Sequence, residues 1–295
     1  MLDLSCIFKE IFKNIKEEVK HMINAKLNNG VLMPIVGLGT FRSKTEDVYQ
    51  AVLDAIEAGY RHIDTAMIYG NEEAIGKAIK DSNIPREELF ITTKLWNSDQ
   101  GFDSAKKAFN LSLKKLGLDY IDLYLIHWFK GYELAVSSYK AMEELYNEGK
   151  IKAIGVSNFN VHHIMKLLEE CDVVPTVNQV ETHIALQNEF LQEYCESVGV
   201  KLEAYAPLMS QNINDLLNDE TMNDIAKKYN KSVPQIAIKW LVIRGIIVIP
   251  KSINKKRIIE NFDIFDFELN KDDMANIKKL NKAKKLFPEF DNVPF

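Results

Sequence analysis

Four side chains of this sequence could together move a proton to or from an oxygen atom: Asp64, Tyr69, Lys94 and His127. A free tyrosine has a pKa of about 10 and is a weak acid near neutrality. A buried ammonium group beside Tyr69 would favour its phenolate and lower that pKa, and Asp64 would keep Lys94 charged and oriented. A histidine can hydrogen-bond the same substrate oxygen and set its orientation. We therefore predict a proton donor that faces a carbonyl oxygen.

None of the four is suited to act as a nucleophile, and carbonyl reduction is the chemistry that fits them. No side chain donates hydride, so the group implies a nicotinamide cofactor. Each residue alone also has an ordinary structural explanation: Asp64 and Lys94 as an ion pair, Tyr69 as packing, His127 as a core residue. These explanations weaken only if the fold brings the four together.

The elements that carry these residues are short apolar runs typical of buried parallel strands. The sequence holds eight of them, at 34–38, 62–65, 89–95, 120–127, 151–156, 175–180, 201–206 and 246–250, with helical patterns between. Such a chain folds as a closed (β/α)8 barrel or as a long doubly wound sheet, and the equal spacing favours the α/β barrel. In a barrel the carboxyl ends of all strands meet at one face, where active sites lie. Asp64, Lys94 and His127 would reach that face from three neighbouring strands.

Local signals add detail to this barrel. Ser43 and Glu46 have the spacing of a capping box, which predicts a helix start there, and Gly59 should end that helix. Asn28-Asn29-Gly30 predicts a hairpin turn ahead of the first barrel strand, and this hairpin would close the barrel's bottom. Pro234 is a good first-turn residue for a later helix.

The first 25 residues form a separate predicted segment, with the barrel domain assigned to residues 26–295. Apolar residues recur at helical spacing over residues 2–22, from Leu4 to Met22, and the intervening lysines and acids balance. This pattern predicts an amphipathic helix packed on the domain or on a partner. An alternative is that the functional chain starts at Met22.

Composition excludes several classes of protein. The 295 residues carry 37 basic and 42 acidic side chains, a net charge of −5, which argues against nucleic-acid binding. Three widely spaced cysteines, Cys6, Cys171 and Cys195, argue against a disulfide framework and for a reducing, cytoplasmic location. The sequence has no apolar run of 18 residues, so no membrane span is expected. We expect a monomer or weak homo-oligomer acting on a small-molecule carbonyl substrate.

Three motifs resemble dinucleotide, phosphate or metal sites but are incomplete. Gly37-Leu38-Gly39 lacks the third glycine of a dinucleotide fingerprint, because position 42 is Arg42. The stretch from Gly70 to Gly76-Lys77 has the wrong spacing for a phosphate loop. His162-His163 lacks the H-E-x-x-H pattern, so no metal site is predicted.

Several stretches, in order over most of the chain, resemble the aldo-keto reductase family. They are Met33-Pro34 with Gly37–Thr40, Gly59–Glu72, Thr93–Trp96, Ile154–Phe159, and Ile249–Ser252 with Arg257 and Glu260-Asn261. The stretch Leu95–Gly101 is similar to the bacterial branch of glyoxal, methylglyoxal and 2,5-diketo-gluconate reductases. The resemblance implies a (β/α)8 barrel that binds extended NADPH without a Rossmann fold.

The resemblance also implies roles for individual residues. Tyr69 would be the general acid, Asp64 and Lys94 its tuning pair, and His127 the residue that orients the substrate. Predicted cofactor contacts are Gly39, Thr40, Ser157, Asn158, Gln179, Tyr205, Leu208, Ser210, Lys251, Ser252, Arg257, Glu260 and Asn261. Among these, Lys251, Ser252 and Arg257 would hold the 2′-phosphate, which favours NADPH over NADH.

Two departures from the family pattern affect the substrate pocket. Trp128-Phe129 stands where Trp-Pro is usual, and Glu181-Thr182-His183-Ile184 where Glu-Tyr-His-Pro is usual. The predicted pocket residues are Phe41, Trp96, Trp128 and Phe129. The same fold also serves in regulatory proteins such as potassium-channel β subunits, and the same residues serve alcohol oxidation, so both readings stay open.

Overall fold

The structure, a computed structural model, describes residues 24–287. The helix predicted over residues 2–22 lies outside the described residues, and so does the proposed start at Met22. Asn24 and Ala25, the last residues of the predicted extension, already belong to the first strand, β1.

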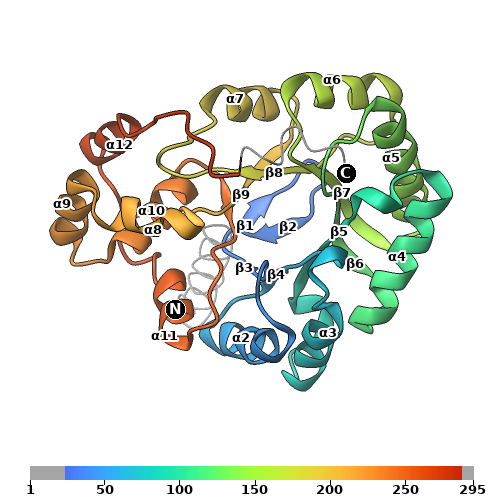
Figure 1. Ribbon diagram of the computed structural model, residues 1–295, viewed down its shortest axis with the longest axis horizontal. Coiled ribbons are helices and arrows are strands. Elements are labelled where there is room, and N and C mark those ends of the chain that lie inside the picture. The colour runs from blue at the N-terminus through green and yellow to red at the C-terminus, as the bar shows by residue number, and fades with distance from the viewer. Residues whose placement is uncertain (1–23, 288–295) are drawn as a thin grey trace, which may run out of the picture.

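Eight parallel strands form a closed barrel (Figure 1). They pair in chain order: β3 (Leu38–Gly39), β4 (His62–Asp64), β5 (Phe90–Leu95), β6 (Ile121–Ile126), β7 (Ile151–Ser157), β8 (Val177–Glu181), β9 (Lys201–Tyr205) and β10 (Ile247–Val248). The amide of Gly37 donates to the carbonyl of Val248 at 2.8 Å, and that of Gly39 donates to Pro250 at 3.1 Å, which closes the ring. All eight predicted runs overlap strands, so the barrel prediction is confirmed.

The closure depends on a glycine. A Cβ atom at Gly39 would lie 2.7 Å from the carbonyl oxygen of Ile249, closer than van der Waals contact allows. The backbones of β3 and of the segment after β10 can therefore approach because position 39 has no side chain.

Helices surround the barrel as an outer layer (Figure 1). They are α2 (Thr45–Ala58), α3 (Glu72–Asp81), α4 (Phe102–Leu116), α5 (Tyr132–Asn147), α6 (Val161–Glu170), α7 (Glu189–Ser197), α8 (Ile213–Leu217), α9 (Glu220–Tyr229), α10 (Val233–Ile243), α11 (Lys255–Phe262) and α12 (Lys271–Lys278). The longer helices bury an apolar stripe; in α2 it includes Val48, Val52 and Ala55. None of the helices within residues 24–287 is both long and apolar enough to cross a lipid bilayer.

The predicted capping box at Ser43 is wrong. Helix α2 begins at Thr45, its N-cap residue is Lys44, and no side chain caps it. Ser43 lies one residue too early, buried, with its amide bonded to the carbonyl of Thr40 at 3.1 Å. The predicted end at Gly59 is confirmed, and Pro234 lies in the first turn of α10, as expected.

The N-terminal hairpin pairs β1 (Asn24–Lys26) with β2 (Leu32–Pro34). The side chain of Asn28 donates to the carbonyl of Pro175, just before β8, and Asn29 donates to that of Lys152 at the start of β7, both at 2.9 Å. The hairpin therefore covers the end of the barrel where the strands begin, as predicted, and leaves the other end open.

Candidate active site

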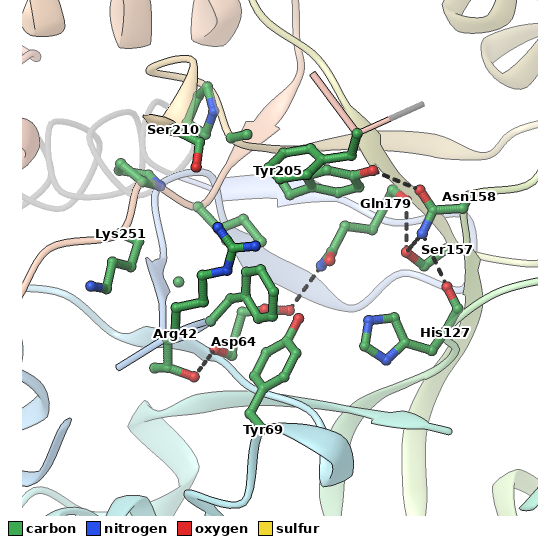
Figure 2. A pocket seen from close by; sticks show the side chains of 18 of the residues that line it. Arg42, Asp64, Tyr69, His127, Ser157, Asn158, Gln179, Tyr205, Ser210 and Lys251 are labelled. Carbon is green, nitrogen blue, oxygen red and sulfur yellow. Dashed lines mark hydrogen bonds between the residues drawn. The ribbon is translucent and has the colours of Figure 1, made fainter. Parts of the chain in front are cut away.

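A cavity of about 600 Å³ opens at the end of the barrel where the strands finish. Figure 2 shows Tyr69 and His127 toward one side of it and Arg42 and Lys251 toward the other. Fifteen predicted site residues line it: Gly39, Thr40, Phe41, Asp64, Tyr69, Trp96, His127, Trp128, Ser157, Asn158, Gln179, Tyr205, Leu208, Ser210 and Lys251.

The floor of the cavity is a buried ion pair. The ammonium of Lys94 donates to both carboxylate oxygens of Asp64, at 2.7 and 2.8 Å, and to the carbonyl of Thr65 at 2.8 Å. Lys94 is fully buried and is the one predicted catalytic residue that does not line the cavity. Burial raises the pKa of the Asp64 carboxyl, while the charge and hydrogen bonds of Lys94 oppose that rise. Breaking such a pair by removing one partner costs about 3–5 kcal/mol.

Tyr69 lies beside this pair at the end of a short 3₁₀ turn, η1 (Met67–Tyr69). Its ring centroid is 5.3 Å from the Lys94 nitrogen and 5.7 Å from the ring of His127. Burial raises the pKa of Tyr69 well above its usual value, and the charges of Asp64 and Glu203 raise it further. The net shift is therefore upward, opposite to the predicted fall, because burial is its largest cause. Tyr69 stays protonated at neutral pH.

His127 follows β6 and is held between two indole rings. The ring centroid of Trp96 lies 5.1 Å away, edge on, and that of Trp128 lies 6.2 Å away. Burial lowers the pKa of His127 well below its usual value, and the charge of Lys94 lowers it further, so the imidazole is neutral. Its buried Nδ1 has no hydrogen-bond partner within residues 24–287.

A polar network lies within and just after β7, β8 and β9. The hydroxyl of Tyr205 donates to Oδ1 of Asn158 at 3.0 Å, and the Asn158 amide donates to the Ser157 hydroxyl and to the His127 carbonyl. The Ser157 hydroxyl donates to the carbonyl of Gln179 at 2.9 Å. This network joins four of the predicted cofactor contacts to the strand end that carries His127 (Figure 2).

The opposite end of the cavity is basic. Lys251 lines it and is exposed, and Arg257 lies in the first turn of α11, which contains no acidic residue. Cations at the amino end of a helix are unfavourable by themselves, because they face the positive end of the helix dipole. The side chain of Asn254 accepts the amide of Arg257 at 3.2 Å, which fixes the turn. An anion here would offset the repulsion.

Four predicted cofactor residues do not line the cavity: Ser252, Arg257, Glu260 and Asn261. They lie on the adjoining turn and on α11, with Arg257 exposed and Asn261 buried. Phe129, a predicted pocket residue, does not line the cavity either. Its ring stacks on His163 at 3.6 Å and meets Phe159 edge on, so it packs against α6.

Sequence reasoning missed several residues of the site. Arg42, Ile68 and Gln211 line the cavity, and the Gln100 side chain donates to the Trp128 carbonyl at 2.7 Å. Beneath the cavity lies Glu203, fully buried on β9. The sequence contained a signal for this residue, because a glutamate within an apolar run is unusual.

Backbone strain is concentrated around this cavity. Of the nine non-glycine residues with positive φ in the described chain, Arg42, Asn158, Ala206 and Ser210 line it. Such conformations cost free energy and tend to gather at functional sites. Residues 24–287 contain no cluster of His, Cys, Asp and Glu side chains suited to a metal ion.

The site therefore combines a neutral tyrosine and a neutral histidine with a buried ion pair, an amide-lined wall and a basic far end. Because the fold is an eight-stranded barrel with its cavity at the strand ends, the molecule has the architecture of a barrel enzyme. The sequence model described as "Aldo/keto reductase family" matches residues 35–282. The chain belongs to this family and is an oxidoreductase.

Individual relatives agree. The chain is 50% identical over 271 residues to glyoxal reductase of Bacillus subtilis, covering 92% of this chain and 97% of that protein. MGS-M4, an aldo-keto reductase from a Medee basin deep-sea metagenome library, is 66% identical with a TM-score of 0.90, covering 92% and 99%. An aldo-keto reductase of Bombyx mori, solved in complex with NADP, is 41% identical with a TM-score of 0.84, covering 89% and 94%.

Proposed function

We propose that this protein reduces small aldehydes and ketones with NADPH and that Tyr69 supplies the proton. The observation that carries the proposal is the meeting of Tyr69 and His127 above the buried Asp64–Lys94 pair, with ring centroids 5.7 Å apart. Four residues that each had an ordinary explanation lie together where a barrel enzyme reacts.

The donors around the cavity fit a nicotinamide dinucleotide. Ser157, Asn158 and Gln179 offer hydroxyl and amide groups for a carboxamide, and the ring of Tyr205 offers an aromatic face. Lys251 and Arg257 offer cations for a phosphate at the far end, with Ser252, Glu260 and Asn261 close by in sequence. The bound NADP of the Bombyx mori relative supports this choice. The cofactor supplies hydride.

Side chains of the protein would orient the substrate and supply the proton. Neutral His127 hydrogen-bonds the substrate oxygen and holds it toward Tyr69. The Tyr69 hydroxyl gives its proton to that oxygen as negative charge develops on it. Asp64 holds the Lys94 ammonium beside the phenolate that remains, and an ammonium nearby favours the charged form.

The walls of the cavity favour a small carbonyl compound. Aromatic and aliphatic side chains surround the reacting end: Phe41, Ile68, Trp96, Trp128 and Phe287. They exclude water but offer few polar contacts to a long polar substrate. With the named activity of the Bacillus subtilis relative, this favours two-carbon and three-carbon oxoaldehydes such as glyoxal and methylglyoxal.

The test is Tyr69→Phe, measured by the loss of reduced-nicotinamide absorbance with methylglyoxal, glyoxal, an aromatic aldehyde, a sugar aldehyde and a diketo-acid. We expect turnover to fall by about 10²–10⁴-fold, the usual contribution of general acid catalysis, with NADPH affinity retained. Tyr49→Phe is the matched control, since Tyr49 bonds Asp81 on the surface. Near wild-type rates in Tyr69→Phe would show that another group donates the proton.

A further inference from the structure

Glu203 is a buried acidic residue that the proposed reaction does not use. It pairs in register with Gln179 on the neighbouring strand, and its Oε2 accepts the Gln179 side-chain nitrogen at 2.8 Å. The same nitrogen donates to Oδ2 of Asp64, also at 2.8 Å. Oε1 of Glu203 lies 3.6 Å from Nε2 of His62 and has no hydrogen-bond partner among the described residues.

We propose that Glu203 is a positioning residue that fixes the amide of Gln179, so that its nitrogen faces Asp64 and its carbonyl oxygen faces the cavity. A primary amide has two N–H groups, and here two carboxyl groups take both. The carbonyl oxygen must then point away from them, where it can accept a hydrogen bond from a carboxamide. The inference rests on the proposed function, because that carboxamide belongs to the nicotinamide.

The charges around Glu203 determine whether it is protonated while it accepts the Gln179 amide. The titratable groups that face it are His62 and Asp64 from β4, Lys94 from β5 and Tyr69 from η1, while its register partner on β10 is the apolar Ile247. With one ammonium and two carboxyl groups, the cluster would hold an uncompensated buried charge if both acids ionised.

Burial raises the pKa of Glu203 to about 8, and the charge of Asp64 contributes to that rise. Burial also lowers the pKa of His62 to about 3, so the imidazole is neutral and does not compensate. Glu203 therefore keeps its proton at neutral pH, and a neutral carboxyl group still accepts the Gln179 amide through its carbonyl oxygen.

The proton on Glu203 also affects the acid above it. A charge on Glu203 raises the pKa of Tyr69, so ionisation of Glu203 makes Tyr69 a weaker proton donor. The stability of the fold also decreases as Glu203 loses its proton. Between the ordinary pKa of 4.5 and the folded value of about 8, the native protein holds a proton that the unfolded chain has lost. Stability contributed by Glu203 is therefore complete below pH 4.5 and is lost as pH rises to 8.

The experiment compares Glu203→Gln and Glu203→Leu with the wild-type protein. Glutamine copies the neutral acid, so NADPH affinity should stay within about threefold of wild type. Leucine removes the acceptor, so the affinity should fall by about tenfold. In the protein without cofactor, one side-chain amide proton of Gln179 should exchange faster in Glu203→Leu, but not in Glu203→Gln, when followed by NMR.

The pH dependence gives a second measurement that needs no cofactor. The unfolding free energy of wild type should fall more steeply between pH 4.5 and 8 than that of Glu203→Gln. Glu143→Gln removes a buried acid on α5 that accepts the amide of Val173 outside the barrel, and shows what the same replacement does away from the cavity.

Two results would overturn the proposal. Unchanged Gln179 exchange in Glu203→Leu would show that Gln179 needs no second anchor, and if leucine prevents folding, Glu203→Ala provides the same comparison. Parallel pH slopes for wild type and Glu203→Gln would show that Glu203 carries no proton. Failure of the wild-type protein to bind NADPH would instead contradict the proposed function, and both cofactor-free measurements would still test Glu203.

Discussion

At the scale of single residues, burial raises the pKa of Tyr69 and lowers that of His127, so both groups at the cavity are neutral. Asp64, Tyr69, Lys94 and His127 were predicted together, and the structure brings them to one end of the barrel. The pKa of Tyr69 was predicted to fall, but the net shift is upward. The Lys94 ammonium donates its hydrogen bonds to Asp64 and Thr65. Burial is the largest cause of the raised pKa of Tyr69.

The basic end of the site allows a residue-scale prediction about cofactor choice. Arg257→Met should weaken NADPH binding by about 10–100-fold and leave NADH binding nearly unchanged, because a guanidinium–phosphate contact is among the strong charge-assisted hydrogen bonds. Fluorescence titration with both cofactors measures this. Lys256→Met, an exposed neighbour in the same turn, is the control. Equal losses for NADPH and NADH would place 2′-phosphate recognition elsewhere.

At the scale of elements, periodicity and turn chemistry predicted most of the barrel. The eight apolar runs correspond to β3–β10, and Asn28-Asn29-Gly30 makes the predicted hairpin turn. What failed depended on exact tertiary contacts. The spacing of Ser43 and Glu46 fits a helix cap, yet the chain there turns to bond Thr40 instead. Phe129 is apolar and follows His127, but its ring stacks on His163, which no local pattern reveals.

Gly76, part of the rejected phosphate-loop pattern, has a packing role between two helices. A Cβ there would lie 2.2 Å from the carbonyl oxygen of Leu116 at the end of α4. Gly76→Ala should therefore destabilise the protein by about 1–3 kcal/mol through overpacking, despite alanine's better helix propensity. Urea denaturation measures the change, with the exposed Glu73→Ala on the same helix as control. A Gly76→Ala protein more stable than wild type would show that α3 and α4 separate easily.

At the scale of the whole molecule, the end of the described chain returns to the mouth of the barrel. The carboxylate of Glu181, at the end of β8, accepts the amides of Leu286 at 2.6 Å and Phe287 at 3.3 Å. The ring of His183 lies 2.9 Å from the same carboxylate. The carbonyl of Ala185 accepts two further amides of this segment, from Lys282 and Lys284. Glu181 and the loop after β8 thus hold the wall of the cavity that Phe287 forms.

This arrangement predicts that Glu181 affects the binding of larger substrates rather than the reaction itself. Glu181→Ala would leave two backbone amides without their acceptor, which costs about 1–3 kcal/mol each when they stay buried, so residues 286–287 should detach instead. The loss of Phe287 from the wall should raise KM for an aromatic aldehyde by about tenfold, with a smaller change for glyoxal and little change in kcat. Hydrogen exchange of the amides in residues 282–287 reports the detachment directly.

Asp215→Ala is the control, since it removes only an exposed ion pair to Lys284 at 3.9 Å, a contact worth less than about 1 kcal/mol. If the amides of Leu286 and Phe287 stayed protected in Glu181→Ala, the apolar contacts of Phe287 alone would be what holds the segment on the barrel.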